Sequence, residues 1–167
     1  ARHIEIQVFG FGAQGSVHLF ERDCSMQRRY QKIIEESPAP EIDRTIIESM
    51  AASAVKLASD VKYEGAGTVE FIYDVDEKKY YFLEMNTRIQ VEHPVTELIT
   101  NNDLVSMQIK FAFDRKTKFL KQEKISSYGH AIECRVYAED PSKNFLPSPG
   151  KIKKMKFPQI PNGIRLD

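Results

Sequence analysis

Five polar residues recur at every second position near the middle of the chain, and this alternation constrains the fold more than any other feature. They are Glu84, Asn86, Arg88, Gln90 and Glu92. In an extended chain, alternate side chains share one face. The run therefore predicts an extended segment that presents oxygen donors, a cation and a carboxylate together. That combination suits a divalent metal ion beside an anionic substrate.

A hairpin is predicted to bring a second carboxylate to this run. Residues 68–73 and 80–85 are rich in β-branched and aromatic side chains, and the polar residues 74–79 separate them. A turn centred near Glu77 places Glu70 opposite Glu84 and Ile72 opposite Phe82. Two carboxylates and the Asn86 amide then converge beside apolar surface.

The N-terminal segment predicts another hairpin. Ile4, Ile6 and Val8 alternate with His3, Glu5 and Gln7, which is typical of a strand with one buried and one solvated face. Residues 10–15 spell the GxGxxG pattern of dinucleotide-binding loops, but that pattern must open a helix. Here another alternating segment follows at 16–21, so the glycines are better explained by a hairpin turn.

The other elements complete an α+β fold, an antiparallel sheet with flanking helices. Asp43 is a plausible N-cap for a helix to about Asp60, and residues 101–103 can cap a second helix at 104–113. Further strands are expected at 131–137 and 151–157, turns at 140–141 and 146–150, and a solvated loop or short helix at 115–124. Both ends of the chain resemble strands, which favours an excised piece of a longer protein.

Composition narrows the possible functions. The 167 residues can bury a core, and 24 basic residues balance 24 acidic ones, so nothing global favours nucleic acid or an acidic membrane. No apolar run approaches the ~18 residues of a transmembrane helix. Cys24 and Cys134 stand alone and are interpreted as free thiols in a reducing compartment.

The polar residues admit more than one interpretation. Glu70, Glu84 and Asn86 suit Mg²⁺, since carboxylates facing each other across a hairpin repel unless a cation joins them, but either glutamate can instead pair with a lysine. Arg88 can clamp an oxyanion and Glu92 can take a proton, yet a charged surface loop is the alternative.

Two further segments are also ambiguous. Residues 21–32 are either a solvated connector or an anion-facing segment built from Arg28, Arg29 and Lys32. His93 precedes Pro94 and is expected in an extended turn, without a metal-binding role.

Six segments resemble biotin carboxylase, an ATP-grasp enzyme or module of acyl-CoA, pyruvate and urea carboxylases. They are residues 2–7, 21–29, 65–71, 84–97, 130–135 and 145–150, and the similarity covers essentially the whole chain, in order. The block at 84–97 is the most specific. The resemblance implies carboxylation of carrier-bound biotin with bicarbonate and MgATP, by way of carboxyphosphate.

The resemblance also implies roles for individual residues. Two Mg²⁺ or Mn²⁺ ions would be held by Glu70, Glu84 and Asn86, and bicarbonate by Lys32, Arg88, Gln90 and the backbone of Val91. Glu92 would deprotonate bicarbonate, and Arg135 would stabilise the ureido oxygen of biotin. The nucleotide would lie near His3, Gln27, Tyr30 and Ile72. Family members often have His where Tyr30 stands and Asp where Phe11 stands; Tyr30 still offers a hydrogen bond, and Phe11 is expected to have no catalytic consequence.

The remaining expectations concern the whole protein. The chain resembles the end of the ATP-grasp domain, residues 1–125, followed by the beginning of the C-terminal domain, residues 126–167. Expected partners are the remainder of the enzyme, a biotin carboxyl carrier and a carboxyltransferase, with no nucleic acid or membrane, in a homo-oligomer of the cytoplasm or mitochondrial matrix. Alone, the chain is expected to be inactive. Alternatives are another ATP-grasp ligase, a non-catalytic nucleotide- or metal-binding module, and a dinucleotide-binding protein.

Overall fold

The chain forms two compact units, Ala1–Arg135 and Val136–Asp167. The structure is a computed structural model that describes residues 1–115, 120–157 and 163–167. The division of the chain at 125/126 stays a prediction.

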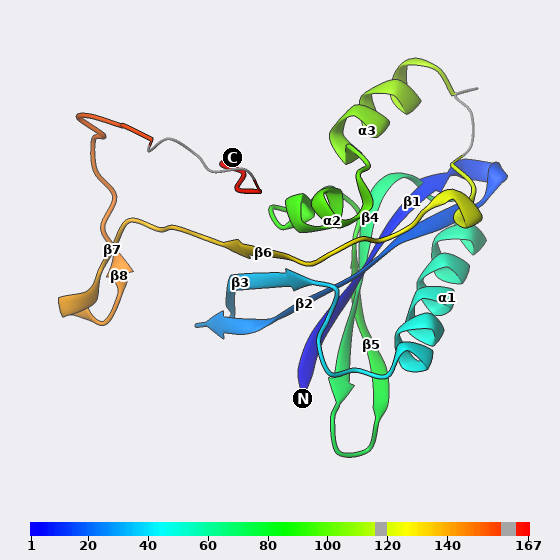
Figure 1. The fold of residues 1–167 in the computed structure, drawn as a ribbon, viewed down its shortest axis with the longest axis horizontal. Helices are drawn as coiled ribbons and strands as arrows, with labels where there is room; N and C mark the ends of the chain where they lie inside the picture. Colours follow the sequence, from blue (N-terminus) through cyan, green and yellow to red (C-terminus); the bar gives the residue numbers. More distant parts are fainter. Residues whose placement is uncertain (116–119, 158–162) are drawn as a thin grey trace. The chain divides into compact units, whose positions relative to one another are not determined.

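One antiparallel sheet forms the centre of the first unit, as predicted. Its spatial order is β5-β4-β1-β2-β3-β6, so the two N-terminal strands lie in the middle (Figure 1). The strands are β1 (Arg2–Phe11), β2 (Ser16–Arg28), β3 (Gln31–Ser37), β4 (Glu64–Asp74), β5 (Lys79–Asn86) and β6 (Ala131–Cys134). The α+β fold class is therefore confirmed.

The glycine-rich segment is a hairpin turn, as its context indicated. β1 and β2 pair antiparallel, and a single 3₁₀ turn, Gly12–Gln14, joins them. Gly12 and Gly15 have φ values of 65° and 95°, a region that glycine enters without steric cost. No helix follows the glycines, so the dinucleotide-binding alternative is excluded.

Helix α1 (Arg44–Asp60) covers one face of the sheet. Asp43 caps it, with its carboxylate accepting from the Thr45 amide at 2.9 Å, as predicted. Its buried residues pack on the side chains of Ile4, Ile6 and Val8. Removing these apolar surfaces from water is the main contribution to stability on this face.

The opposite face of β1 is not solvated, which corrects the sequence prediction. Glu5 and Gln7 are both 0% exposed. β1 lies at the centre of the sheet, and further helices cover this side of it. Phe9 and Phe11 pack against Phe111 of α3 (Leu104–Phe113), with ring centroids 6.0 and 5.7 Å apart.

Helix α2 (His93–Thr100) covers the polar half of the same face, and the prediction of an extended turn at His93 is wrong. Pro94 lies in the first helical turn, where its missing N–H costs nothing because that donor has no partner within the helix. Helix α3 begins after Asp103, whose carboxylate accepts from the Ser106 amide at 2.7 Å, as predicted.

The β4–β5 pairing is confirmed at the carboxylates and shifted beyond them. Glu70 lies opposite Glu84, but Ile72 lies opposite Tyr81, not Phe82. The register changes between Glu70 and Phe71, which leaves Leu83 as an extra residue in β5. Counting residue pairs outward from the turn could not predict this β-bulge.

The remaining segments partly match expectation. β6 ends at Cys134, although the Arg135 amide still donates to the Ile33 carbonyl at 2.9 Å. In the second unit, β7 (Glu139–Asp140) and β8 (Leu146–Pro147) pair on either side of a 3₁₀ turn, Pro141–Lys143. The strand expected at 151–157 is absent from these described residues.

The stretch at 115–124 contains a 3₁₀ turn at Gln122–Lys124, and residues 116–119 lie outside the described part. Among the described helices, none is long and apolar enough to cross a membrane.

Gly10 provides a test of the packing between β1 and the end of α1. A Cβ at this position would lie 2.1 Å from the carbonyl oxygen of Tyr63, a backbone atom that cannot turn aside. We expect Gly10→Ala to lower the free energy of unfolding by about 3 kcal/mol, the upper part of the range for overpacking. Gly150→Ala is the control, since nothing lies within 4 Å of its added Cβ. Urea denaturation measures both, and equal stabilities would contradict the packing.

Candidate active site

The guanidinium of Arg22 lies at the centre of a buried polar cluster on the α2 side of the sheet. Arg22 is 0% exposed. It donates to five side-chain oxygens contributed by β1, β4, the turn after β5 and α2, at 2.6 to 3.2 Å. They belong to Gln7, Thr96, Glu5, Thr68 and Gln90. A buried charge is tolerated when it is paired and hydrogen-bonded in this way.

Lys32 extends the cluster from β3. Its ammonium contacts Glu5, and it reaches Glu92 at 2.7 Å and Glu70 at 3.2 Å. Burial by itself lowers the pKa of Lys32, but the negative charges around it, Glu5 and Glu92 among them, raise the pKa above its usual range. Lys32 is therefore a permanent cation that three carboxylates share.

Glu70 on β4 accepts hydrogen bonds at both oxygens. His3 Nε2 lies 2.7 Å from Oε2, and Gln90 Nε2 donates to Oε1 at 2.9 Å. Burial opposes ionisation, but the His3 contact, the charge of Lys32 and the Gln90 contact together lower the pKa of Glu70 to about 2. Glu70 is consequently ionised at neutral pH.

The residues present fit a divalent cation at Glu70, Glu84 and Asn86. The Asn86 amide lies between the two carboxylates, with Nδ2 at 2.8 Å from Glu70 Oε1 and 3.0 Å from Glu84 Oε1. A half-turn of this amide would bring its oxygen beside the two carboxylates, at the expense of the contact that Arg88 makes to Asn86 Oδ1 at 3.3 Å. Few carboxylates plus an amide oxygen leave room for phosphate and water, as Mg²⁺ requires.

The alternating run is not one extended strand, which corrects the opening prediction. β5 ends at Asn86, and residues 87–92 form a turn that leads into α2. Gln90 and Glu92 are nevertheless buried, because Arg22 and Lys32 hold their side chains. Long-range hydrogen bonds to Gln90 and ion pairs with Glu92, not strand periodicity, bring these groups beside Glu70.

Glu92 lies between two cations. Lys32 contacts its Oε1 at 2.7 Å, and the Arg135 guanidinium donates to its Oε2 at 2.8 Å. Burial favours the neutral acid, but the charges of Arg22 and Lys32 and the Lys32 contact lower the pKa of Glu92 to about 2. Arg135 also donates to Glu35 at 2.6 Å and so joins β6 to β3.

Other predicted site residues lie at the rim. Gln27 Nε2 lies 2.8 Å from His3 Nδ1, which links it to Glu70. Arg88 is exposed and donates to Asn86 Oδ1 at 3.3 Å. Tyr30 is 100% exposed in the β2–β3 turn, Val91 is 60% exposed, and Ile72 is half-buried opposite His3.

The sequence analysis missed two residues of the cluster, Glu5 and Arg22, and left open a solvated position for residues 21–24, which are buried. Glu5 was expected in solvent, and Arg22 was given no role, yet both are 0% exposed. The available signal was the presence of polar residues at every second position of a central strand. Such residues indicate a buried network only once it is known which other elements cover that face of the sheet. Residues 21–24 are buried in β2, so the solvated-connector alternative for 21–32 fails there.

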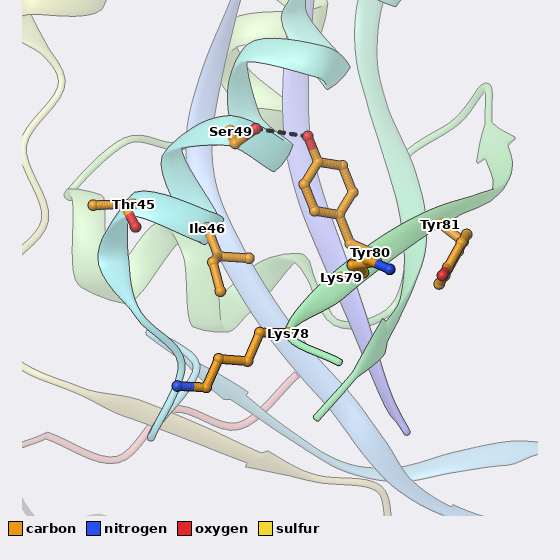
Figure 2. Close-up of a pocket in the computed structure, with 7 residues that line it drawn as sticks. All are labelled: Thr45, Ile46, Ser49, Lys78, Lys79, Tyr80 and Tyr81. Carbon is orange, nitrogen blue, oxygen red and sulfur yellow. Dashed lines mark hydrogen bonds between the residues drawn. The ribbon is translucent and has the colours of Figure 1, made fainter. Parts of the chain in front are cut away.

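A separate pocket of about 320 Å³ lies between α1 and β5, on the other side of the sheet (Figure 2). It is open, and Ser49 and Tyr80 share a hydrogen bond of 2.7 Å at its wall. None of the predicted site residues lines it. Its lining is Thr45, Ile46, Ser49, Lys78, Lys79, Tyr80 and Tyr81.

Two family models match the chain. Residues 1–119 match the ATP-binding domain of the carbamoyl-phosphate synthase L chain, and residues 133–167 match the biotin carboxylase C-terminal domain. Together they include every predicted site residue.

Individual relatives give the same picture. Biotin carboxylase 1 of Bacillus subtilis is 58% identical over 99% of this chain and 36% of its own length. The mitochondrial methylcrotonoyl-CoA carboxylase subunit alpha of Mus musculus is 52% identical over 99% of this chain and 23% of its own. The chain thus spans about a third or less of the length of these curated relatives.

A solved structure resembles the fold closely. The biotin carboxylase domain of Hydrogenobacter thermophilus 2-oxoglutarate carboxylase, in complex with MgADP, ADP and bicarbonate, has a TM-score of 0.87 and 47% identity. The match covers 95% of this chain and 34% of that one.

Removing the central cation tests the cluster. Arg22→Met keeps side-chain volume but leaves Glu5 as a buried carboxylate without its guanidinium partner. We expect a loss of about 3–5 kcal/mol in the free energy of unfolding, the usual cost of breaking a buried ion pair. Lys56→Met removes the exposed pair with Asp60 and should cost under about 0.5 kcal/mol. A small effect of Arg22→Met would show that the cluster does not stabilise the fold.

Proposed function

The chain belongs to the biotin carboxylases of the ATP-grasp family, and from this premise we propose that it forms one wall of an active site that carboxylates carrier-bound biotin. Bicarbonate and MgATP would be the co-substrates. One observation carries the proposal: Glu92 lies between Lys32 and Arg135, in the same cluster as Glu70. A carboxylate between two cations, beside possible metal ligands, suits an acid–base step on an anion.

The nucleotide would lie along β4, β5 and the start of β1. Glu70, Glu84 and Asn86 would hold two Mg²⁺ or Mn²⁺ ions, which when bound neutralise charge on the transferring phosphate. His3 and Gln27 form a hydrogen-bonded pair beside Glu70 and would contact ATP. Ile72 would pack on adenine, and Tyr30 would reach the ribose.

Bicarbonate would bind at the turn that precedes α2. Arg88 and Lys32 would supply positive charge, Gln90 a hydrogen bond, and Val91 its backbone. Arg88 is exposed and therefore accessible to an incoming anion, whereas Lys32 and Gln90 are fixed by Glu5, Glu70 and Arg22. Because Lys32 and Gln90 are already held in place, little entropy would be lost in ordering them around the anion.

Substrate binding would activate Glu92 as the base. With a pKa of about 2 it is ionised but weakly basic. When bicarbonate engages Lys32 and biotin engages Arg135, Glu92 shares both of its cations, and its pKa rises. It would then take the bicarbonate proton, so that the bicarbonate oxygen attacks the γ-phosphate and forms carboxyphosphate.

The second half-reaction would use Arg135. Carboxyphosphate breaks down to CO₂ and phosphate, and the phosphate takes the N1′ proton of biotin. Arg135 would stabilise the negative charge that develops on the ureido oxygen, and the nitrogen would attack CO₂. Fixed charges placed where negative charge develops suit this chemistry.

Partners follow from the same proposal. A biotin carboxyl carrier would deliver biotin, a carboxyltransferase would use the product, and further biotin carboxylase sequence would complete the nucleotide site. The parent enzyme would be a homo-oligomer of the cytoplasm or the mitochondrial matrix.

Loss of the base provides a direct test. In the full-length protein, we expect Glu92→Gln to lower kcat for bicarbonate-dependent ATP cleavage by ~10²–10⁴-fold, the usual contribution of a general base. MgATP binding, measured by calorimetry, should change little. Glu123→Gln, at a surface position with a 68% exposed side chain, is the control. An unchanged kcat for Glu92→Gln would refute its assignment as the base.

Metal binding is a second test. Glu84→Gln removes a carboxylate without changing its size, and we expect weaker Mn²⁺ binding in the presence of ATP, by at least the ~10–100-fold typical of lost supporting ligands. Electron paramagnetic resonance of free Mn²⁺ measures it. Glu77→Gln, at the exposed turn of the same hairpin, should bind as the unmodified protein does.

A further inference from the structure

Two glutamates lie directly opposite each other where β3 meets β6. Glu35 pairs with Glu133 in the antiparallel register, so their side chains project to the same face. Like charges in this arrangement repel. The strand neighbour Glu36 projects to the other face, where it contacts His130 at 2.9 Å.

The surroundings supply too few hydrogen bonds for two ionised carboxylates. Glu35 Oε2 and Glu133 Oε2 are both buried, and neither has a hydrogen-bond partner among the described residues. Arg135 donates to Glu35 Oε1 at 2.6 Å and to Glu92 Oε2 at 2.8 Å. One guanidinium therefore serves two carboxylates already, with a third beside it. Burying a neutral carboxyl costs far less than burying a carboxylate whose charge is not compensated, which favours protonation of one of the two glutamates.

We propose that Glu35 and Glu133 together carry one proton at slightly acidic pH, and that this proton keeps Arg135 positioned between Glu35 and Glu92. Neither glutamate is assigned contact with a substrate. Both are positioning residues that act through Arg135. The inference rests on the proposed function of Arg135.

Electrostatics of the neighbouring groups support a single proton. Burial and the charge of Glu35 raise the pKa of Glu133 to about 7, and the charge of Arg135 opposes them only in part. Burial also raises the pKa of Glu35. The other charges facing the pair are Glu92 from the turn, Lys32 from β3 and Arg22 from β2; on α2, His93 and Glu97 lie 3.9 Å from each other.

Loss of the proton would disturb Arg135. Above neutral pH, Glu133 becomes a third carboxylate competing for a guanidinium that holds Glu35 and Glu92. Arg135 is drawn along β6 toward Glu133, its own strand neighbour, and away from the place where biotin's oxygen is expected. Biotin carboxylation should fall on the alkaline side as a result.

The test compares Glu133→Gln with Glu36→Gln in the full-length protein, from pH 6 to 9. We expect the unmodified protein to lose kcat for biotin carboxylation as pH rises through about 7, and Glu133→Gln to match it at pH 6 but to lose this alkaline decline. Glu36→Gln should keep the decline, because Glu36 lies on the opposite face. Identical pH profiles for the unmodified protein and Glu133→Gln would overturn the proposal.

Stability provides a readout that does not depend on catalysis. The folded-state pKa of Glu133 lies above the ordinary 4.5, so its contribution to stability is present below about pH 4.5 and is lost as pH rises through about 7. Glu133→Gln should therefore raise the unfolding temperature at pH 8 and leave it unchanged at pH 4.

Glu35→Gln should remove the same titration, seen as the infrared band of a protonated carboxyl, because the charge of Glu35 raises the pKa of Glu133. Absence of that band in the unmodified protein at pH 6 would refute the shared proton. If instead Glu92→Gln were active, the proposed function would fail while these two readouts would still report on the pair.

Discussion

The buried guanidinium of Arg22 is the interaction on which the rest of the site depends. Its five acceptors come from two strands, a turn and a helix that are far apart in sequence. Each of these hydrogen bonds alone contributes modestly to the free energy of folding, but leaving any acceptor buried and unpaired is costly. The geometry is consequently cooperative: the turn that carries Gln90 is held against the sheet because the sheet already holds Arg22.

Local features were predictable from the sequence, and the buried cluster was not. Helix α1, the cap at Asp43 and the two hairpins follow from periodicity and turn chemistry within about twenty residues. The position of Glu92 depends on Lys32, which lies sixty residues away in the sequence. A contact over that separation cannot be predicted from a local sequence pattern. Helix α2 was missed because the residue before a proline usually avoids helical conformation, and the place of Pro94 in the first turn of a helix was not recognised.

The residues proposed for the site differ in their exposure to solvent. Glu84 and Arg88 are exposed, Asn86 is half-buried, and Glu70 and Glu92 are buried. Of the residues proposed to hold metal and bicarbonate, Glu84 and Arg88 are thus accessible, while Glu70, Gln90 and the proposed base Glu92 are buried, where a nearby charge has a larger effect on a pKa. Resemblance supplied the roles proposed for these residues, whereas the three-dimensional arrangement accounts for the low pKa of Glu92, because burial is outweighed by the charges of Arg22 and Lys32 beside it.

The extra residue at Leu83 determines which side chains share a face of β5. Without it, Phe82 would project to the same face as Glu84; with it, Phe82 lies opposite Phe71, and Tyr81 lies opposite Ile72. The alternation of faces along β5 is therefore reset at Leu83. Substitutions at the apolar end would alter the wall beside Ile72, whereas Glu84, which we propose as a metal ligand, keeps its pairing with Glu70 on the other side of the bulge.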